Sequence, residues 1–559
     1  MYFRVLMNLF FQKRHRLLFY SSWLLLALAQ SASTELIADE AYYWVYSRFP
    51  AWGYFDHPPM IAFIIKSGYA IFNNELGVRL VCALLSTFTA LITESLTERK
   101  NPFLFYTIVL SIGVLQIAGF LAVPDTPLLF FTALFFYTYR SFIKNTNWKN
   151  TLLLAIAISL LFYTKYHGLL IVLFTFLSNI KLFTRWQTWV AGAFVLILYT
   201  PHLLWQWDHD WISFRYHLFE SNVNAYKFSY TTDYLLGQIL LAGPLAGFIL
   251  LPAAFMYKVK SQTEKALKFT LIGIYLIFLL SSFRGKVEVN WAMPAIIPLI
   301  VLSHQFILVK ISWIKPLRII SFVSFLLIIA VRIYLVVDIG PDNSLKGRFR
   351  NKAWAKTIAE KTGNSPVVFY NSYQRASLFW FYSGIQSHSH NSYTDRKSNY
   401  NFWPTESNLL GKKVFIADIY GINTFSDSVK TKKGWVGLSF DSMYAALGNI
   451  KIIPGEKNVT LYNNSLTTKI TPEMPDNYRN FLQTNSEIQT ELVAGVFNGK
   501  DLLREYKTGI TAQQIAKQNN SFQIQLTNLP KGGNEVRFGI RSKNYFPTHN
   551  SETIHVIGL

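Results

Sequence analysis

Apolar stretches of membrane-spanning length dominate the first 339 residues of this chain. A helix that crosses a bilayer needs about 20 predominantly apolar residues. Because lipid offers the backbone no hydrogen-bond partners, such stretches predict a bundle of transmembrane helices. Eleven stretches approach this length, near residues 17–37, 76–96, 102–122, 127–143, 151–165, 168–183, 188–205, 234–256, 268–283, 291–309 and 318–338. The sequence therefore predicts a polytopic α-helical membrane protein.

The distribution of basic residues predicts how this bundle is oriented. If the N-terminus lies inside, the inner segments contain 18 Lys and Arg residues and the outer loops contain seven. Basic residues accumulate on the cytoplasmic side of membrane proteins. We therefore expect the chain to begin inside and the region after residue 339 to lie outside.

The sequence pattern changes after residue 339, where no further stretch of spanning length follows. Within residues 340–430, "SPVVFYNSYQRASLFWFYSG" has the pattern of strand, turn and helix, and "KKVFIADI" that of another buried strand. Within residues 431–559, alternating runs such as "SFQIQLTNL" and "EVRFGIRS" indicate β-strands. We therefore expect three domains: a transmembrane domain over 1–339, a soluble α/β unit over 340–430 and a β-rich domain over 431–559.

The formal net charge of +22 is shared between these parts. Residues 340–559 contain 26 basic and 16 acidic residues, a balance of +10. A charge of that size beside a membrane can attract anionic headgroups, but a lysine-rich solvated surface is the simpler interpretation and we favour it. No nucleic-acid partner is expected for a domain on the outer side. The single cysteine, Cys82, excludes an internal disulfide and a cysteine-based metal site.

Acidic residues gather in the early outer loops and basic residues in the later ones. This distribution suits a reaction that needs a base to deprotonate a nucleophile and cations to stabilise a departing anion. The candidates are Asp39, Glu40, Asp56 and His57 in "DEAYYWVYSRFPAWGYFDHPP", Asp125 in "VPDTP", Lys165 and Tyr166 in "YTKYHG", and Arg284, Lys286, Glu288 and Asn290 in "RGKVEVNW".

Several of these residues also have a purely structural explanation. Asp39 and Asp125 could each cap the helix that follows. Lys165 could extend along the bundle to the membrane interface, and His57 could be a loop residue fixed by the prolines after it. The histidines of "HLLWQWDHDWISFRYH" are expected to be structural, because buried histidines often only satisfy their neighbours; they are His202, His209 and His217.

The loop motifs resemble a known family. "ADEAYYW", "GYFDHPPM", "ELGVRL", "PDTPLLF", "YTKYHGLL" and "GKVEVNWAMP" occur in order on successive predicted spans. They are similar to the polytopic glycosyltransferases of the GT-C superfamily, in the branch of protein O-mannosyltransferases and lipid A aminoarabinose transferases. "YQRASLFWFYSG" and "SNYNFWP" resemble the downstream region of that branch. The resemblance covers roughly residues 35–410, and the region after about 430 has no recognised counterpart.

The resemblance implies a GT-C-like fold in a bacterial inner membrane and transfer of a sugar on its outer face. The donor would be a polyprenyl-phosphate-linked sugar, and the acceptor a lipid, a glycan or a protein. It implies that Asp39 is the base of an inverting displacement, and that Asp56 and His57 lie near the donor phosphate. The aminoarabinose relatives have Glu-Lys where this chain has Asp-His, so His57 is a weaker phosphate ligand than a lysine.

General chemistry agrees with such a reaction. A glycosyl phosphate leaves as a stable anion, so its departure does not require the general acid that glycoside hydrolysis needs. One base and a set of cations therefore suffice; no cofactor is expected, and a divalent metal is optional. We assign the cation role to His57, Lys165, Arg284 and Lys286.

Other functions remain open at this stage. A transporter of an amphipathic or sugar-linked substrate is the main alternative, since intramembrane charges also mark transport paths. Transporters usually contain internal repeats, and no such repeat is visible in this sequence. A glycan polymerase or ligase with a diphosphate donor and a non-catalytic envelope scaffold are further alternatives. The sequence leaves the sugar and the acceptor unassigned.

Overall fold

The fold is described from a computed structural model, for residues 2–220, 225–337, 349–420, 425–462, 464–518 and 520–557. The chain divides into two compact units. The first comprises Met1–Glu35 and Tyr43–Ser344, and the second comprises Leu36–Tyr42 and Leu345–Leu559. The division falls within one helix, α2, whose first residues belong to the second unit.

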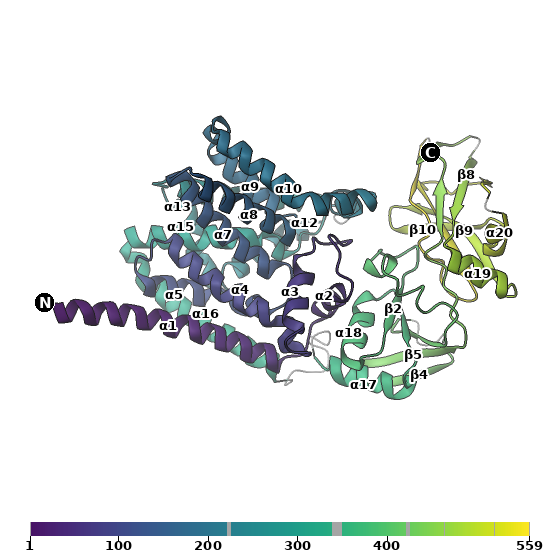
Figure 1. Cartoon of the computed structure of the whole chain (residues 1–559), viewed down its shortest axis with the longest axis horizontal. Helices are drawn as coiled ribbons and strands as arrows, with labels where there is room; N and C mark the ends of the chain where they lie inside the picture. Colours follow the sequence, from purple (N-terminus) through teal and green to yellow (C-terminus); the bar gives the residue numbers. More distant parts are fainter. Residues whose placement is uncertain are drawn as a thin grey trace. The chain divides into compact units, whose positions relative to one another are not determined.

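The first unit is a bundle of helices packed side by side (Figure 1). Its helices, and α2, are α1 (Tyr2–Ser33), α2 (Ala38–Arg48), α3 (Met60–Tyr69), α4 (Glu75–Leu96), α5 (Pro102–Ser111), α6 (Gly113–Ile117), η1 (Ala118–Phe120), α7 (Asp125–Lys144), α8 (Trp148–Thr164), α9 (Gly168–Ser178), η2 (Ile180–Thr184), α10 (Trp186–Asp208), α11 (Ile212–Arg215), η3 (Tyr216–Glu220), α12 (Phe228–Leu241), α13 (Gly247–Met256), α14 (Gln262–Ser281), η4 (Val289–Ala295), α15 (Ile296–Val309), η5 (Ile311–Trp313) and α16 (Ile314–Val336).

Polar side chains fix where several of these helices begin. The Asn74 side chain accepts a hydrogen bond from the backbone of Gly77 at the start of α4, and Asn147 does the same for α8. Ser261 and Glu264 form a reciprocal capping box at the start of α14. Because the first backbone N–H groups of a helix have no partner within it, such caps specify the helix boundary.

Three of the predicted spans are not continuous helices, and the stretch 168–183 is one of them, divided between α9 and η2. The stretch 102–122 is divided between α5, α6 and η1, with Ile112 in an extended conformation. The stretch 234–256 is divided between α12 and α13, where Gly243 has a φ of +132° and is followed by Pro244. That backbone conformation favours glycine, and proline cannot donate the next helical hydrogen bond.

Four helical segments in the described residues are long and apolar enough to cross a membrane by length and composition. They are α4, α10, η4 continued by α15, and η5 continued by α16. Five shorter apolar helices accompany them. The count of about eleven spans therefore stays a prediction, whereas the predicted apolar helical core is confirmed.

The second unit contains an α/β part and a β-rich part. Its strands are β1 (Val367–Tyr370), β2 (Ser387–His390), β3 (Val414–Asp418), β4 (Asp427–Thr431), β5 (Gly434–Asp441), β6 (Lys451–Pro454), β7 (Asn458–Thr460), β8 (Leu466–Glu473), β9 (Thr490–Asn498), β10 (Asp501–Lys507), β11 (Phe522–Leu526), β12 (Glu535–Ser542) and β13 (Ile554–Ile557). Its helices are α17 (Asn351–Thr362), α18 (Tyr373–Ser383), η6 (Asn399–Asn401), α19 (Asp476–Thr484) and α20 (Ala512–Gln518).

The strands of this unit form three sheets. The α/β sheet has the order β2-β1-β3-β5-β4, with β1 parallel to β2 and to β3, and α17 and α18 pack against it. The other two sheets have the orders β10-β9-β12-β13-β7 and β11-β8-β6. Along β8, buried and exposed residues alternate strictly, as expected for a strand with one face on the core. The predicted C-terminal β-rich region is confirmed.

Candidate active site

The loop after α2 places the side chain of Asp56 among hydrogen-bonded tyrosines. The Tyr46 hydroxyl donates a hydrogen bond to Oδ1 of Asp56 over 2.9 Å, and both side chains are buried. The ring of Tyr54 lies against that of Tyr46, with centroids 4.0 Å apart. The hydroxyl of Tyr54 in turn donates to the backbone of Tyr46 and of Phe49. Asp56 is therefore a buried carboxylate in a preformed polar setting.

Three side chains of the segment 202–217 hold this loop by its backbone. His202 Nδ1 is 2.7 Å from the carbonyl oxygen of Trp52, Ser213 Oγ is 2.7 Å from that of Tyr54, and His217 Nε2 is 2.7 Å from that of Asp56. We call these three side chains the carbonyl clamp. A carbonyl oxygen only accepts, so His202 has its proton on Nδ1 and His217 has one on Nε2.

The clamp is connected to Tyr166. The Gln206 amide donates to the hydroxyl of Tyr166 over 2.9 Å and to Ser213 Oγ over 2.8 Å. The Tyr166 hydroxyl lies 3.3 Å from His202 Nε2, the ring nitrogen that the clamp leaves as an acceptor. Tyr166 therefore belongs to the shell that positions the loop.

Gly53 allows this loop to approach helix α10. A Cβ atom at Gly53 would lie 2.2 Å from a ring carbon of Trp205. No real Cβ contact is that short, so any larger residue would displace the loop or the indole ring. The glycine of "AWGYFDHPP" is thus required by close packing.

Asp125 and Lys165 form a buried ion pair. Lys165 Nζ lies 2.8 Å from Oδ1 of Asp125, and each residue is only 5% exposed. The side-chain amide of Asn290 donates to Oδ2 of the same carboxylate over 2.9 Å. Asp125 begins α7, Lys165 follows α8 and Asn290 lies in η4, so two separate segments of the chain converge on the carboxylate at the start of α7.

The remaining cationic candidates differ in burial. The His57 ring is partly buried, with its centroid 5.6 Å from that of Tyr43 and 6.3 Å from that of His217. Lys286 is exposed and forms an ion pair with Glu288 over 2.9 Å, which raises the pKa of the lysine. Arg284 is also exposed. The structure thus brings Asp125, Lys165 and Asn290 together, whereas Lys286 and Glu288 pair with each other at the surface.

Asp39 and Glu40 lie in the part of α2 that belongs to the second unit. Gln374 of α18 donates a hydrogen bond from Nε2 to Oδ1 of Asp39 over 3.1 Å. Glu40 is fully buried and accepts from the backbone N–H of Ile37, so it caps the start of α2.

The segment around these acids is fastened within the second unit. The Tyr382 hydroxyl accepts a hydrogen bond from the Leu36 backbone, and the Tyr42 hydroxyl accepts from the backbone and side chain of Asn399. α18 and the "SNYNFWP" motif therefore hold the chain on either side of Asp39. Apart from the resemblance of both motifs to one family, no sequence feature predicts this attachment.

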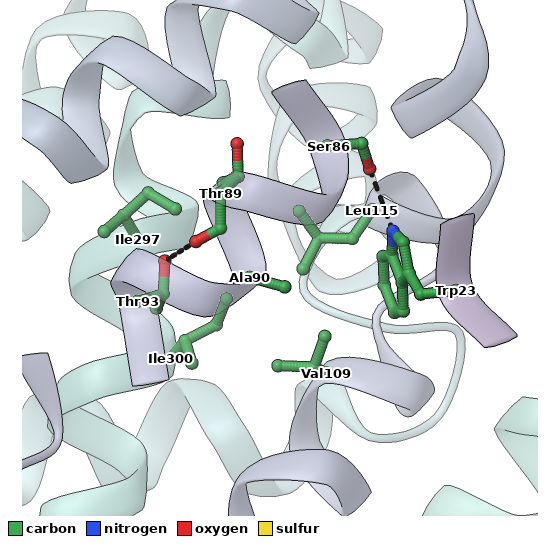
Figure 2. Close-up of a pocket in the computed structure, with 9 residues that line it drawn as sticks. All are labelled: Trp23, Ser86, Thr89, Ala90, Thr93, Val109, Leu115, Ile297 and Ile300. Atoms are coloured by element: carbon green, nitrogen blue, oxygen red, sulfur yellow. Dashed lines mark hydrogen bonds between the residues drawn. The ribbon is translucent and has the colours of Figure 1, made fainter. Parts of the chain in front are cut away.

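Two other features lie apart from these residues. Among the described residues, no group of three or more His, Cys, Asp or Glu side chains is placed to hold a metal ion. A cavity of about 10 Å³, near the lower limit for one water molecule, lies between α1, α4, α5, α6 and α15 (Figure 2). It is lined mainly by apolar groups, and the Trp23 indole donates to Ser86 Oγ beside it. None of the candidate acids or cations lines it.

Composition and motif analysis alone did not assign the clamp. His202 and His217 were expected to be structural, and their contacts with loop carbonyls give that expectation a definite form. Tyr46 and Ser213 had not been singled out. The only signal that could have found them is the density of hydrogen-bonding side chains in two loops on the same side of the predicted bundle.

Comparisons with known proteins agree with this architecture. The sequence profile of the family described as "Dolichyl-phosphate-mannose-protein mannosyltransferase" matches residues 56–205. The chain is 24% identical over 375 residues to the lipid A galacturonosyltransferase RgtD of Rhizobium johnstonii, a match that spans 62% of this chain and 78% of that protein. It is also 38% identical over 91 residues to an uncharacterized protein of Aquifex aeolicus, covering 15% and 18% of the two chains.

Two crystal structures have a similar fold. ArnT from Cupriavidus metallidurans in the apo state matches with a TM-score of 0.57 and 13% identity, over 76% of this chain and 98% of that one. The same protein bound to undecaprenyl phosphate matches with a TM-score of 0.54 and 12% identity, over 76% and 97%. At this identity the likeness is one of fold.

Proposed function

We propose that the chain is a membrane glycosyltransferase of the GT-C superfamily, in the branch that modifies lipid A, with a polyprenyl-phosphate-linked sugar donor. The similar proteins support this proposal, since one is named a lipid A galacturonosyltransferase and another was crystallised with undecaprenyl phosphate. We propose a lipid acceptor on the outer face of a bacterial inner membrane.

The observation that carries the proposal is the buried ion pair of Asp125 and Lys165, which Asn290 joins by a hydrogen bond, in the same unit as buried Asp56. Burying ionised side chains in a membrane protein is costly, and such residues usually serve a function. An ammonium group has three N–H donors, and the ion pair with Asp125 uses one of them. Lys165 can therefore present the others to a phosphate oxygen while Asp125 keeps it in place.

In the proposed reaction Asp39 accepts the proton of the acceptor hydroxyl. The acceptor oxygen forms a bond to the anomeric carbon as the bond from that carbon to the phosphate oxygen breaks, with inversion. The polyprenyl phosphate leaves as an anion, stabilised by cations drawn from Lys165, His57, Arg284 and Lys286. The hydrogen bond from Gln374 supports this assignment because it orients the Asp39 carboxylate.

We propose that this step needs no bound cofactor and that any divalent metal is accessory. The basis is chemical: the leaving phosphate is already a stable anion, and protein cations can neutralise its charge. Transport of a lipid-linked substrate is the alternative activity, and it predicts movement of an unmodified substrate across a bilayer.

The test is a transfer assay with the full-length protein in lipid nanodiscs. Polyprenyl-phosphate donors that carry different sugars are offered with lipid A, and products are identified by mass spectrometry. Asp39→Asn should abolish turnover while donor binding survives, because the variant keeps the shape but cannot accept a proton. Gln374→Leu is the milder companion variant. Wild-type turnover in Asp39→Asn would refute the base assignment, and vesicle uptake without product would favour transport.

A further inference from the structure

Arg332 is a buried cation that the proposed reaction does not use. It lies on α16, four residues before that helix ends at Val336, and is only 5% exposed. Within the described part of the chain its side chain makes one hydrogen bond, from Nη1 to Oε1 of Gln116, which is long at 3.3 Å. Among the described residues no carboxylate pairs with it, and its Nε–H has no acceptor.

Gln116 is the second buried donor at this place. Its residue is 4% exposed, and its amide nitrogen Nε2 also has no acceptor in the part of the chain that the structure describes. Gln116 belongs to α6, within the interrupted stretch between α5 and α7. Irregular backbone at membrane depth occurs where it is enclosed by protein or lines a polar site. Two unsatisfied donors therefore meet beside a helix break.

Neighbouring contacts place Arg332 and Gln116 at the C-terminal end of α1. The segment that contains the candidate acids follows this end in the chain. Gln30 of α1 donates to the backbone carbonyl of Arg332 over 3.1 Å. The Arg332 guanidinium lies over the ring of Phe120, 5.8 Å from its centroid, and the Arg79 guanidinium lies 5.5 Å from the same ring. Arg79 donates to the carbonyls of Ser31, Thr34 and Glu35, which follow Gln30 directly.

A buried guanidinium without a counter-ion is strongly unfavourable. Natural proteins rarely leave two adjacent buried donors unpaired. Guanidinium and amide N–H groups that lack acceptors on two neighbouring side chains suit an oxyanion, and arginine is the usual ligand of phosphate. The apolar ring of Phe120 on one side leaves the polar edge of Arg332 as its binding side.

We propose that Arg332 and Gln116 bind a phosphate oxygen of a membrane lipid, as a second anion site separate from the Asp125–Lys165 group. The inference deepens the proposed function and rests on it for the identity of the lipid. The phosphate belongs either to the polyprenyl donor or to the lipid acceptor, and in both cases the site would hold the headgroup at the level of the helix break.

The test measures lipid binding by the full-length protein in nanodiscs, independently of turnover. Undecaprenyl phosphate and lipid A are titrated separately into wild type, Arg332→Gln, Arg332→Lys and Gln116→Leu. Arg318→Gln is the matched control, because Arg318 lies on the same helix but is exposed. Thermal unfolding shows whether each variant is folded, and removing an unpaired buried charge is not expected to unfold the protein.

We expect Arg332→Gln to weaken binding of one of the two lipids by about tenfold or more, because it loses a hydrogen bond between charged partners. Arg332→Lys should recover part of the loss, and Arg318→Gln should bind like wild type. The lipid whose binding falls identifies the source of the phosphate. Unchanged binding of both lipids by folded Arg332→Gln would overturn the site. Weakened binding by a protein that transfers no sugar would uphold the site and reject the proposed function.

Discussion

His217 donates a hydrogen bond from Nε2 to the backbone carbonyl of Asp56 across 2.7 Å, although the two residues are 161 positions apart. His202 and Ser213 bind the carbonyls of Trp52 and Tyr54 in the same way. Alternate carbonyls of one loop are thus fixed by one segment of the chain. A loop held by its backbone can orient the side chains of Asp56 and its neighbours with little freedom.

The first prediction concerns this clamp. His217→Ala should lower kcat of sugar transfer by about tenfold, because a loop that loses one anchor spends less time in the productive geometry. His217→Gln, which keeps a donor at a similar reach, should recover part of the rate. His209→Gln is the control, since His209 Nδ1 lies 2.9 Å from the Trp205 carbonyl of its own helix. Equal rates in all three variants would show that the clamp is not needed.

The second prediction concerns Gly53. Gly53→Ala should destabilise the protein by about 1–3 kcal/mol, because the new methyl group would overlap the Trp205 ring. Gly192→Ala is the matched control, since a Cβ there meets nothing within 4 Å. Thermal unfolding in detergent measures both. If the two variants unfold at the same temperature, the close approach of the loop to Trp205 is wrong.

The third prediction concerns the buried ion pair. Asp125→Asn or Lys165→Met alone should cost about 3–5 kcal/mol, because each leaves one buried charge unpaired. The double variant should be less destabilised than the sum of the two. Lys286→Met should change stability by less than about 1 kcal/mol, since the Lys286–Glu288 pair is exposed. Strict additivity of the Asp125 and Lys165 variants would contradict a direct pair.

The fourth prediction concerns pH and the second unit. Burial lowers the pKa of His388 to about 3 and that of His390 to about 4. Below about pH 6.5 the unfolded chain binds protons that these folded histidines do not. Stability should therefore fall on acidification from about pH 6.5 towards pH 4, by about 1.4 kcal/mol per pH unit for each histidine.

A neighbouring carboxylate opposes part of this loss. Glu406 Oε2 lies 3.9 Å from Nε2 of His388, and burial raises the pKa of this glutamate. On acidification Glu406 therefore binds a proton in the folded state at a higher pH than in the unfolded state, which stabilises the folded state. Unfolding curves of the second unit between pH 7 and pH 5 measure the net slope. His388→Gln should flatten it, whereas His555→Gln should not, because His555 is exposed. If stability falls more steeply with acidification in His388→Gln than in wild type, His388 is not a source of the acid sensitivity.

Local pattern was sufficient for much of the fold. The apolar stretches predicted α4 and α10 within a few residues, because burial in lipid requires long uninterrupted apolarity. Strict alternation predicted strands such as β11 and β12 in the C-terminal region. The breaks at Ile112 and Gly243 were not predicted, since hydropathy averages over the few residues that interrupt a helix.

The candidate site also contains residues that the sequence predicts and residues that it does not. The motifs selected Asp125, Lys165 and Asn290, and the structure brings these three together. It does not show which residue acts as the base, so the role of Asp39 stays a prediction. Tyr46 and Gln374, which bind Asp56 and Asp39, were not selected, because a tyrosine or a glutamine has no distinctive spacing.

The sequence alone was enough to predict a polytopic helical membrane protein whose loop motifs resemble the GT-C superfamily, because apolar length and ordered loop motifs are local properties. Which loops meet is visible only in the folded chain. The clamp on Trp52 and Asp56 and the pairing of Asp125 with Lys165 join residues from different helices. So does the contact between Arg332 and Gln116, which lie 216 positions apart. Such contacts depend on how the helices pack, and side-chain packing between distant segments leaves no periodic trace in the sequence.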